Sequence, residues 1–103
     1  MKNYTGSDLR QDFKTFFSKE KSRISKILKD LGCTDIQMSR QFYYFYGFFT
    51  SKSGQTYYFC CSDVRHFGYN QIRYKIAKDY KDYGGSGMNQ YVNIDNIKEM
   101  ELI

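Results

Sequence analysis

The spacing of apolar residues in the first third of the chain predicts one long amphipathic helix. These residues recur every three or four positions, so they fall on one stripe of a helical surface. The predicted helix covers about residues 6–31, begins with a Thr5/Asp8 capping pattern and ends before Gly32, a residue typical of the position after a helix. The stripe consists of Leu9, Phe13, Phe16, Phe17, Ile24, Ile27, Leu28 and Leu31.

One acidic residue, Glu20, lies in the gap of this stripe, where residues 18–23 include no apolar side chain. A buried carboxylate without a partner is very costly. Glu20 is therefore expected to pair with a lysine or arginine, or to face solvent at a bend of the helix. A structural pairing is favoured over a catalytic acid.

The middle of the chain is dominated by aromatic residues. Residues 42–49 read Phe-Tyr-Tyr-Phe-Tyr-Gly-Phe-Phe, and a second aromatic run begins at Tyr57. We predict two strands here, about 41–50 and 55–62, joined by a turn at 51–54. Because a strand alternates faces, rings project from both sides of the sheet. One helix covers only one side, so the other is expected to meet a partner or ligand, or to stay an exposed apolar patch.

The register of this hairpin is predicted to pair Thr50 with Gln55, which sets Gly47 opposite Tyr58. An aromatic ring over a strand glycine covers its bare backbone.

The remaining segments complete a two-layer α+β domain. Residues 35–40 are expected to be a connector and 62–70 irregular, while 71–77 and 89–94 are predicted strands and 95–103 a final helical turn or two. The whole chain, 1–103, is predicted to be a single domain with a long N-terminal helix packed on an antiparallel sheet of about four strands.

Charge and cysteine content narrow the functional classes. The chain has 16 Lys and Arg against 11 Asp and Glu, a net charge of +5. That balance favours anionic partners, although it equally serves solubility.

The cysteines Cys33, Cys60 and Cys61 are too few for a disulfide framework, so we expect reduced thiols and a cytoplasmic location. No apolar run reaches the length of a membrane span, and no signal peptide is expected.

None of the candidate reactive groups matches a known pattern. Cys60, Cys61 and His66 lack the spacing of zinc ligands, because adjacent cysteines in a strand diverge. Cys61 and His66, with Asp63 between them, are the residue types of a nucleophilic site but have no recognised spacing. The glycines of 84–87 are either a flexible hairpin tip or a phosphate cradle. We predict no catalytic site, no metal and no cofactor.

The strongest functional signal is the interleaving of basic and aromatic residues after position 64. Bases stack on exposed rings while lysine and arginine hold phosphates. We therefore predict a small non-catalytic binding protein for single-stranded nucleic acid or a nucleotide, the alternative for this segment being an ordinary solvated strand face. The predicted ligand-binding residues are Arg65, His66, Arg73, Tyr74, Lys75, Lys78, Tyr80, Lys81 and Tyr83.

A second hypothesis places the function in the aromatic hairpin. Tyrosine is enriched at the anchoring points of protein interfaces. The chain would then be an inhibitor from a phage or mobile element that binds a host defence protein. The same surplus of rings predicts a homo-oligomer. The predicted interface residues are Tyr44, Tyr46, Phe48 and Tyr57.

Overall fold

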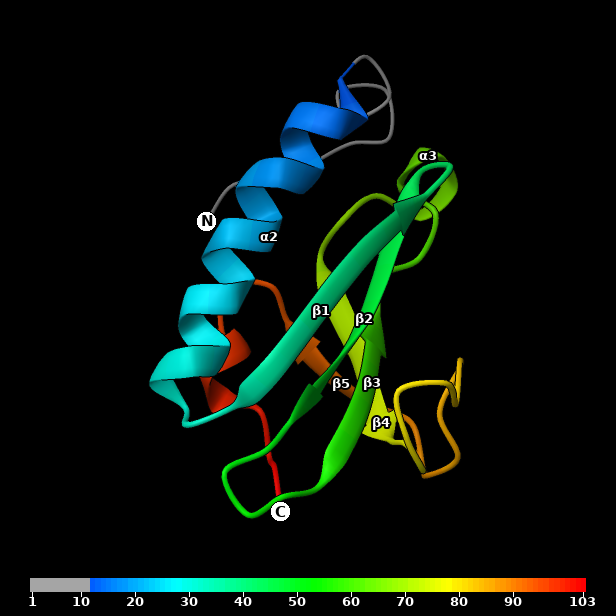
Figure 1. Cartoon of the computed structure of the whole chain (residues 1–103). Helices are drawn as coiled ribbons and strands as arrows, with labels where there is room; N and C mark the ends of the chain where they lie inside the picture. Colours follow the sequence, from blue (N-terminus) through cyan, green and yellow to red (C-terminus); the bar gives the residue numbers. More distant parts are fainter. Residues whose placement is uncertain (1–11) are drawn as a thin grey trace.

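A computed structural model describes residues 12–103, which form a helix packed on one face of an antiparallel sheet (Figure 1). The sheet has five strands in the order β1-β2-β3-β4-β5, so every strand pairs with its neighbour in sequence. This confirms the predicted α+β arrangement with its long helix at the N-terminal side. The elements are α2 (Phe13–Asp30), β1 (Thr34–Gln41), β2 (Tyr44–Thr50), β3 (Thr56–Cys60), α3 (Val64–Phe67), β4 (Gln71–Ile76), β5 (Gln90–Asn93) and the 3-10 turn η1 (Ile97–Glu99).

Helix α2 begins at Phe13 instead of near residue 6. The side chain of Asp12 accepts a hydrogen bond from the Thr15 N–H at 3.2 Å and so caps the first turn. The predicted capping pair, Thr5 and Asp8, lies outside the described residues. Asp12 is the N-cap instead of Thr5, seven positions later in the sequence. Either residue type can do this, because a short polar side chain at the N-cap accepts hydrogen bonds from free backbone N–H groups.

The end of α2 is as predicted. Gly32 has a φ of +86°, a conformation that glycine adopts without a steric penalty. Its N–H donates to the carbonyl of Lys29 at 2.9 Å, and the N–H of Cys33 donates to the carbonyl of Leu28 at 2.9 Å. These two bonds form a Schellman motif, which turns the chain back toward the sheet.

The core lies between α2 and the sheet and is mostly aromatic. Ring pairs stack within it, for example Phe49 and Tyr57 with centroids 5.3 Å apart. Glu20 is 5% exposed, and its two carboxylate oxygens accept hydrogen bonds from Nε and Nη2 of Arg23 at 2.7 and 2.8 Å. The structure thus confirms the structural ion pair. Other members of the core are Ile24, Leu28, Phe45, Phe59, Ile72, Tyr74 and Ile97.

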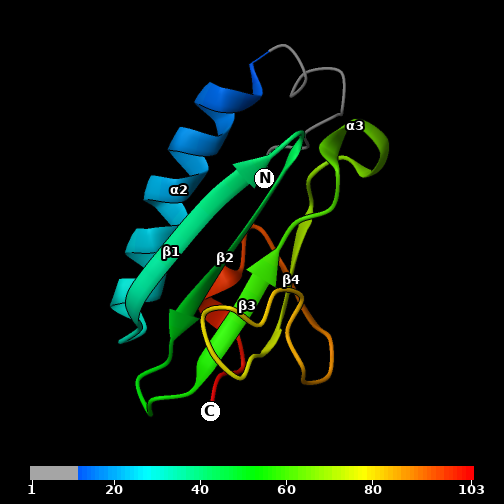
Figure 2. The same cartoon turned by 45° about the vertical axis from the view of Figure 1, so that its right-hand side comes forward.

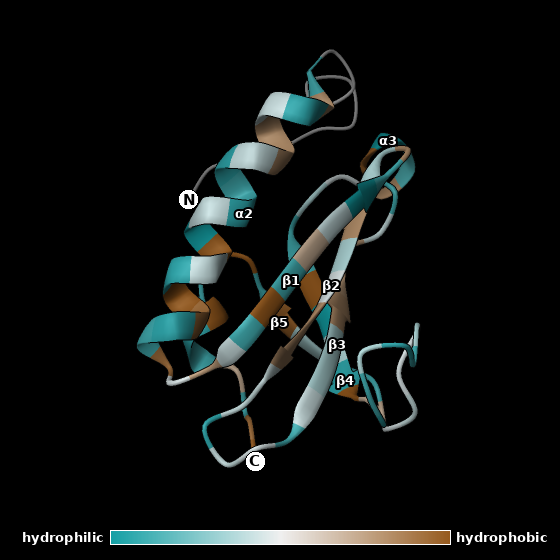
Figure 3. Ribbon diagram, in the orientation of Figure 1, coloured by the Kyte–Doolittle hydropathy of each residue, from teal (hydrophilic) through white to brown (hydrophobic). Residues whose placement is uncertain are grey.

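Strand β1 corrects the prediction of a connector over residues 35–40. Its pattern is weak: only Ile36 and Met38 contact the core, and Figure 3 shows the strand as hydrophilic apart from its middle. Asp35 has a φ of +52°, and the pairing with β2 is irregular near it. An edge strand with one partner needs few apolar residues, so its pattern resembles that of a polar loop.

The register of the β2–β3 hairpin differs from the prediction by one residue. Thr50 pairs with Thr56 and not with Gln55, because the Ser51 N–H donates to the Gln55 carbonyl at 2.8 Å and closes a longer loop. Gly47 consequently faces Phe59, whose ring covers it. A shift of one residue exchanges the two faces of a strand. This shift decides where every ring of β3 points.

The later segments follow the prediction more closely. The strands expected at 71–77 and 89–94 are β4 and β5. The segment 62–70 contains the short helix α3, and the predicted final helical turn is η1. Within residues 12–103, none of the helices has the length and apolar character that crossing a bilayer requires.

The chain after η1 is held by tyrosine hydroxyls from the core. The hydroxyl of Tyr74 accepts the N–H of Glu101 at 3.0 Å, and that of Tyr57 accepts the N–H of Ile103 at 3.1 Å. These bonds explain why tyrosines, and not phenylalanines, occupy two positions facing α2.

The β1–β2 turn supplies a test of this backbone geometry. Phe42 has a φ of +53° and an exposed ring, although this conformation is unfavourable for bulky side chains and common for asparagine and glycine. We expect Phe42→Asn to raise the free energy of unfolding by about 1 kcal/mol, measured by urea denaturation. Phe67→Asn is the matched control, because Phe67 is equally exposed but has an ordinary backbone. A loss of stability in Phe42→Asn would contradict the turn geometry.

Candidate functional site

The candidate site lies on the face of the sheet that points away from α2, which we call the outer face. It carries a cross-strand row in which Tyr46 is opposite Cys60, Cys60 opposite Arg73, and Arg73 opposite Tyr91. The row therefore crosses four neighbouring strands, with a cation between rings. The outer face comprises Tyr44, Tyr46, Phe48, Tyr58, Cys60, Gln71, Arg73, Lys75 and Tyr91.

Part of the outer face is covered by the chain itself. The segment 77–89, yellow to orange in Figure 2, lies in front of β3 on this side. The rings of Tyr80 and Tyr83 each lie 5.4 Å from that of Phe48, and the Tyr80 hydroxyl is 2.7 Å from the Thr50 hydroxyl. Phe48 is only 3% exposed as a result. A partner molecule is therefore not needed to cover this part of the sheet.

The segment 77–89 is folded by bonds to β4 and within itself. The N–H groups of Ser86 and Gly87 both donate to the Ile76 carbonyl at 2.9 Å. The carboxylate of Asp82 accepts the N–H of Lys78 and the hydroxyl of Ser86, and these bonds lower the pKa of Asp82. The glycines serve this folding, since Gly87 lies against Ile76 with little space for a side chain.

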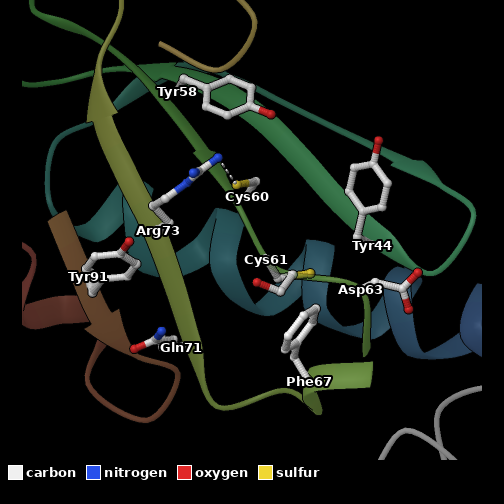
Figure 4. Close-up of a pocket in the computed structure, with 10 residues that line it drawn as sticks. Tyr44, Tyr58, Cys60, Cys61, Asp63, Phe67, Gln71, Arg73 and Tyr91 are labelled. Carbon is white, nitrogen blue, oxygen red and sulfur yellow. Dashed lines mark hydrogen bonds between the residues drawn. The ribbon is translucent and has the colours of Figure 1, made fainter. Parts of the chain in front are cut away.

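The uncovered part of the outer face is hollowed. A cavity of about 640 Å³ opens there, and we call it the hollow. Figure 4 shows the rings of Tyr44, Tyr58, Phe67 and Tyr91 placed around Arg73. The remaining lining residues are Cys60, Cys61, Ser62, Asp63 and Gln71.

Arg73 is the central group of the hollow and is half-buried. One guanidinium nitrogen donates to the Cys60 sulfur at 3.4 Å. The ion pairs found among residues 12–103 join Arg23 to Glu20 and Arg65 to Asp63, so no carboxylate in that part of the chain neutralises Arg73. Sulfur is a weak acceptor. The guanidinium therefore retains its charge and donors for an anionic ligand.

The negative charge at the rim of the hollow is already balanced. Asp63 accepts the N–H of Arg65 at 2.9 Å and binds its guanidinium at 2.7 Å. These bonds to Arg65 lower the pKa of Asp63. The guanidinium of Arg65 also lies 4.5 Å from the centre of the Tyr43 ring. Arg65 is thus committed to Asp63 and Tyr43 and does not line the hollow.

Of the residues predicted to bind the ligand, the structure places only Arg73 in the hollow. Tyr74 was predicted to stack on a base, which is wrong, because it is buried against the α2 side with its hydroxyl bonded to the tail. Lys75 is on the outer face beneath Gly85. The others are exposed or half-buried outside the hollow: His66 on α3, and Lys78, Tyr80, Lys81 and Tyr83 on the segment 77–89.

The predicted interface residues lie partly in the core and partly on the outer face. Tyr57 was expected to be an exposed anchor but faces α2 in the core, as a consequence of the register shift. Phe48 is on the outer face as expected, but Tyr80 and Tyr83 bury it. Tyr44 lines the hollow, and Tyr46 is half-buried beside Tyr83. Neither Tyr57 nor Phe48 offers an exposed ring.

Several residues of the hollow were missed by sequence reasoning. Gln71 was within reach, because alternation along β4 puts it on the same face as Arg73. Tyr91 was within reach for the same reason, since it alternates with Val92. Tyr58 was assigned to the wrong face by the register error. Phe67 had no signal, because its segment was expected to be irregular.

The thiol of Cys61 does not supply a nucleophile. The sulfur of Cys61 accepts a hydrogen bond from the Phe45 N–H at 3.4 Å, and burial raises the pKa of Cys61 to about 12. It is therefore protonated at neutral pH and cannot act as the thiolate that nucleophilic catalysis needs. The three cysteines are free and buried. Within the described part of the chain, no three His, Cys, Asp or Glu side chains are grouped to hold a metal.

Comparison with protein families, with curated proteins and with solved structures finds no match for this chain.

The burial of Cys61 predicts a pH dependence of stability. Because the folded pKa is raised, the folded state holds the proton more tightly, and stability is lost as pH rises from about 9 to about 12. We expect the stability difference between wild type and Cys61→Ala, measured by urea denaturation, to shrink above pH 9. Val64→Ala, a truncation nearby without a titrating group, should show a constant difference. A constant difference for Cys61→Ala would contradict the burial of its thiol.

Proposed function

We propose that this protein is a non-catalytic binding protein that engages an anionic ligand, single-stranded nucleic acid or a nucleotide, through the hollow on its outer face. The observation that carries the proposal is Arg73, a half-buried cation with no carboxylate partner in residues 12–103, surrounded by aromatic rings. A guanidinium matches a phosphate in charge and geometry, and flat rings stack on bases. A nucleotide unit, which joins a phosphate to a flat base, uses both features at once.

The size and charge of the site support this function. A volume of about 640 Å³ lies within the range of roughly 300–1,000 Å³ typical of small-ligand sites. The chain has a net charge of +5, which attracts anions at a distance. Lys78 and Lys81 are exposed on the segment 77–89, so we assign them to this long-range attraction and not to direct contact.

Binding without catalysis is favoured by the state of the reactive groups near the hollow. The Cys61 thiol is protonated at neutral pH, and the carboxylate of Asp63 is occupied by Arg65. Neither is poised to transfer a proton or attack a ligand.

The test is the affinity for a fluorescent oligothymidylate, measured by anisotropy in wild type and Arg73→Gln. A hydrogen-bonded charge contributes about 1.5–3 kcal/mol, so we expect binding weaker by roughly 10- to 100-fold. Lys98→Gln is the control, because it makes the same charge change on η1, which contacts α2 on the other side of the sheet. Equal affinities for wild type and Arg73→Gln would contradict the proposal.

A second candidate function, binding to a protein, is favoured by two phenylalanines at one end of the molecule. Phe42 and Phe67 are each 70% exposed. Their segments lie together, because the Val64 N–H donates to the Tyr43 carbonyl at 2.9 Å. Exposed rings of this kind anchor interfaces. The partner would be a host defence protein inhibited by a phage or mobile-element product, or a second copy of this chain.

The self-association form of this candidate has a direct test. We expect light scattering to detect a homo-oligomer whose dissociation constant rises at least tenfold in Phe42→Asn. Lys52→Asn, a change in the exposed β2–β3 loop at the opposite end, should leave the assembly intact. A monomer over the whole concentration range would exclude self-association through this end.

A further inference from the structure

The hollow is continuous with neighbouring depressions of the outer face. Two smaller depressions adjoin it, of about 360 and 220 Å³. Both share Gln71 with the hollow; the larger also shares Tyr91 and the smaller Phe67. We call the three together the groove. It runs over the outer face from Tyr44 on β2 to Asn93 on β5.

We propose that the groove binds a single strand of nucleic acid, several nucleotides at a time, in preference to a free nucleotide. This rests on the proposed function and names which of its two ligands the site selects. Three properties of the groove support it: its charge, the chemistry of its lining and its length.

The charge of the groove matches a phosphodiester. Arg73 is its only lining cation among the described residues, and the one lining carboxylate, Asp63, is balanced by Arg65. A phosphodiester has one negative charge per nucleotide. A terminal phosphate has about 1.5 to 2 at neutral pH, and longer phosphate chains have more. One unpaired guanidinium therefore matches the charge of a single backbone phosphate, which predicts one phosphate contact for a bound strand.

The rest of the lining suits bases. Tyr91 is 56% exposed, and Phe67 is also largely exposed, so both rings are accessible for stacking. Between and beyond them lie the side-chain amides of Asn70, Gln71 and Asn93. An amide both donates and accepts hydrogen bonds, as do the edges of bases. A polyanion without bases would leave the rings and amides unused.

The length of the groove corresponds to a short stretch of strand. Neighbouring β-strands are about 4.8 Å apart, so the three intervals from β2 to β5 span roughly 14 Å. Stacked bases follow one another at about 3.4 Å. The groove therefore accommodates about four nucleotides.

The test is a length series of thymidine ligands: the 5′-monophosphate, and the oligomers of two, four and eight nucleotides, measured by calorimetry. We expect affinity to rise at least tenfold from the monophosphate to the tetramer and to change little beyond it. The logarithm of the binding constant should fall with the logarithm of salt concentration with a slope of about −0.7, the value for one phosphate contact on a single strand. Arg73→Gln should make this slope shallower.

Ring stacking is tested at the far side of the groove. We expect Tyr91→Leu to weaken tetramer binding by roughly tenfold and Tyr91→Phe, which keeps the ring, to leave it unchanged.

Three other outcomes would each contradict a different part of the proposal. If the monophosphate binds as tightly as the tetramer, the groove assignment is wrong while the proposed function survives. If polyphosphate binds as tightly as the tetramer, or the salt slope is −3 or steeper, exposed lysines and not the groove hold the ligand. If no anionic ligand binds, the proposed function falls as well.

Discussion

The architecture depends on one constraint: the central hairpin is apolar on both of its faces, and a single helix covers only one of them. Helix α2 and the turn η1 share one core with Phe45, Phe49, Tyr57 and Phe59, and the ring of Phe17 on α2 lies 5.9 Å from that of Phe45. The opposite rings need another cover, because exposed aromatic surface of this extent is costly in water. The segment 77–89 provides it for half of the outer face through Tyr80 and Tyr83. The hollow is the half that remains.

Because part of the outer face stays uncovered, the site has an unpaired positive charge at Arg73. Arg73 lies in the lining of the hollow beside the Cys60 sulfur, and no carboxylate of residues 12–103 is paired with it. The guanidinium of Arg73 is partly removed from water by the surrounding protein. An anion that binds in the hollow is therefore attracted to Arg73 more strongly than to a fully exposed lysine. Arg23 and Arg65 show the contrast, because each is already paired with a carboxylate of its own.

Tyrosine hydroxyls connect the two layers of this arrangement. In the core, Tyr57 and Tyr74 reach the backbone of the C-terminal residues, and on the outer face Tyr80 reaches Thr50. A ring that is buried for its apolar area thus also satisfies a polar group, which a phenylalanine cannot do. The tyrosine-rich composition is therefore partly structural, whereas the rings of Tyr91 and Phe67 in the groove stay exposed.

Local patterns were sufficient for α2 and its end at Gly32, for the alternation of β4 and for the existence of the aromatic hairpin. Each rests on contacts between near neighbours along the chain, which the spacing of residues reports. Local patterns did not predict three features: the edge strand β1, the pairing of Thr50 with Thr56, and the folding of the segment 77–89 over Phe48. They arise from long-range contacts, such as the hydrogen bond of Thr50 with Tyr80, that no short window of sequence contains. The hollow is built from these long-range contacts, which is why Arg73 and Tyr44 were among the predicted residues while Tyr58, Phe67 and Tyr91 were not.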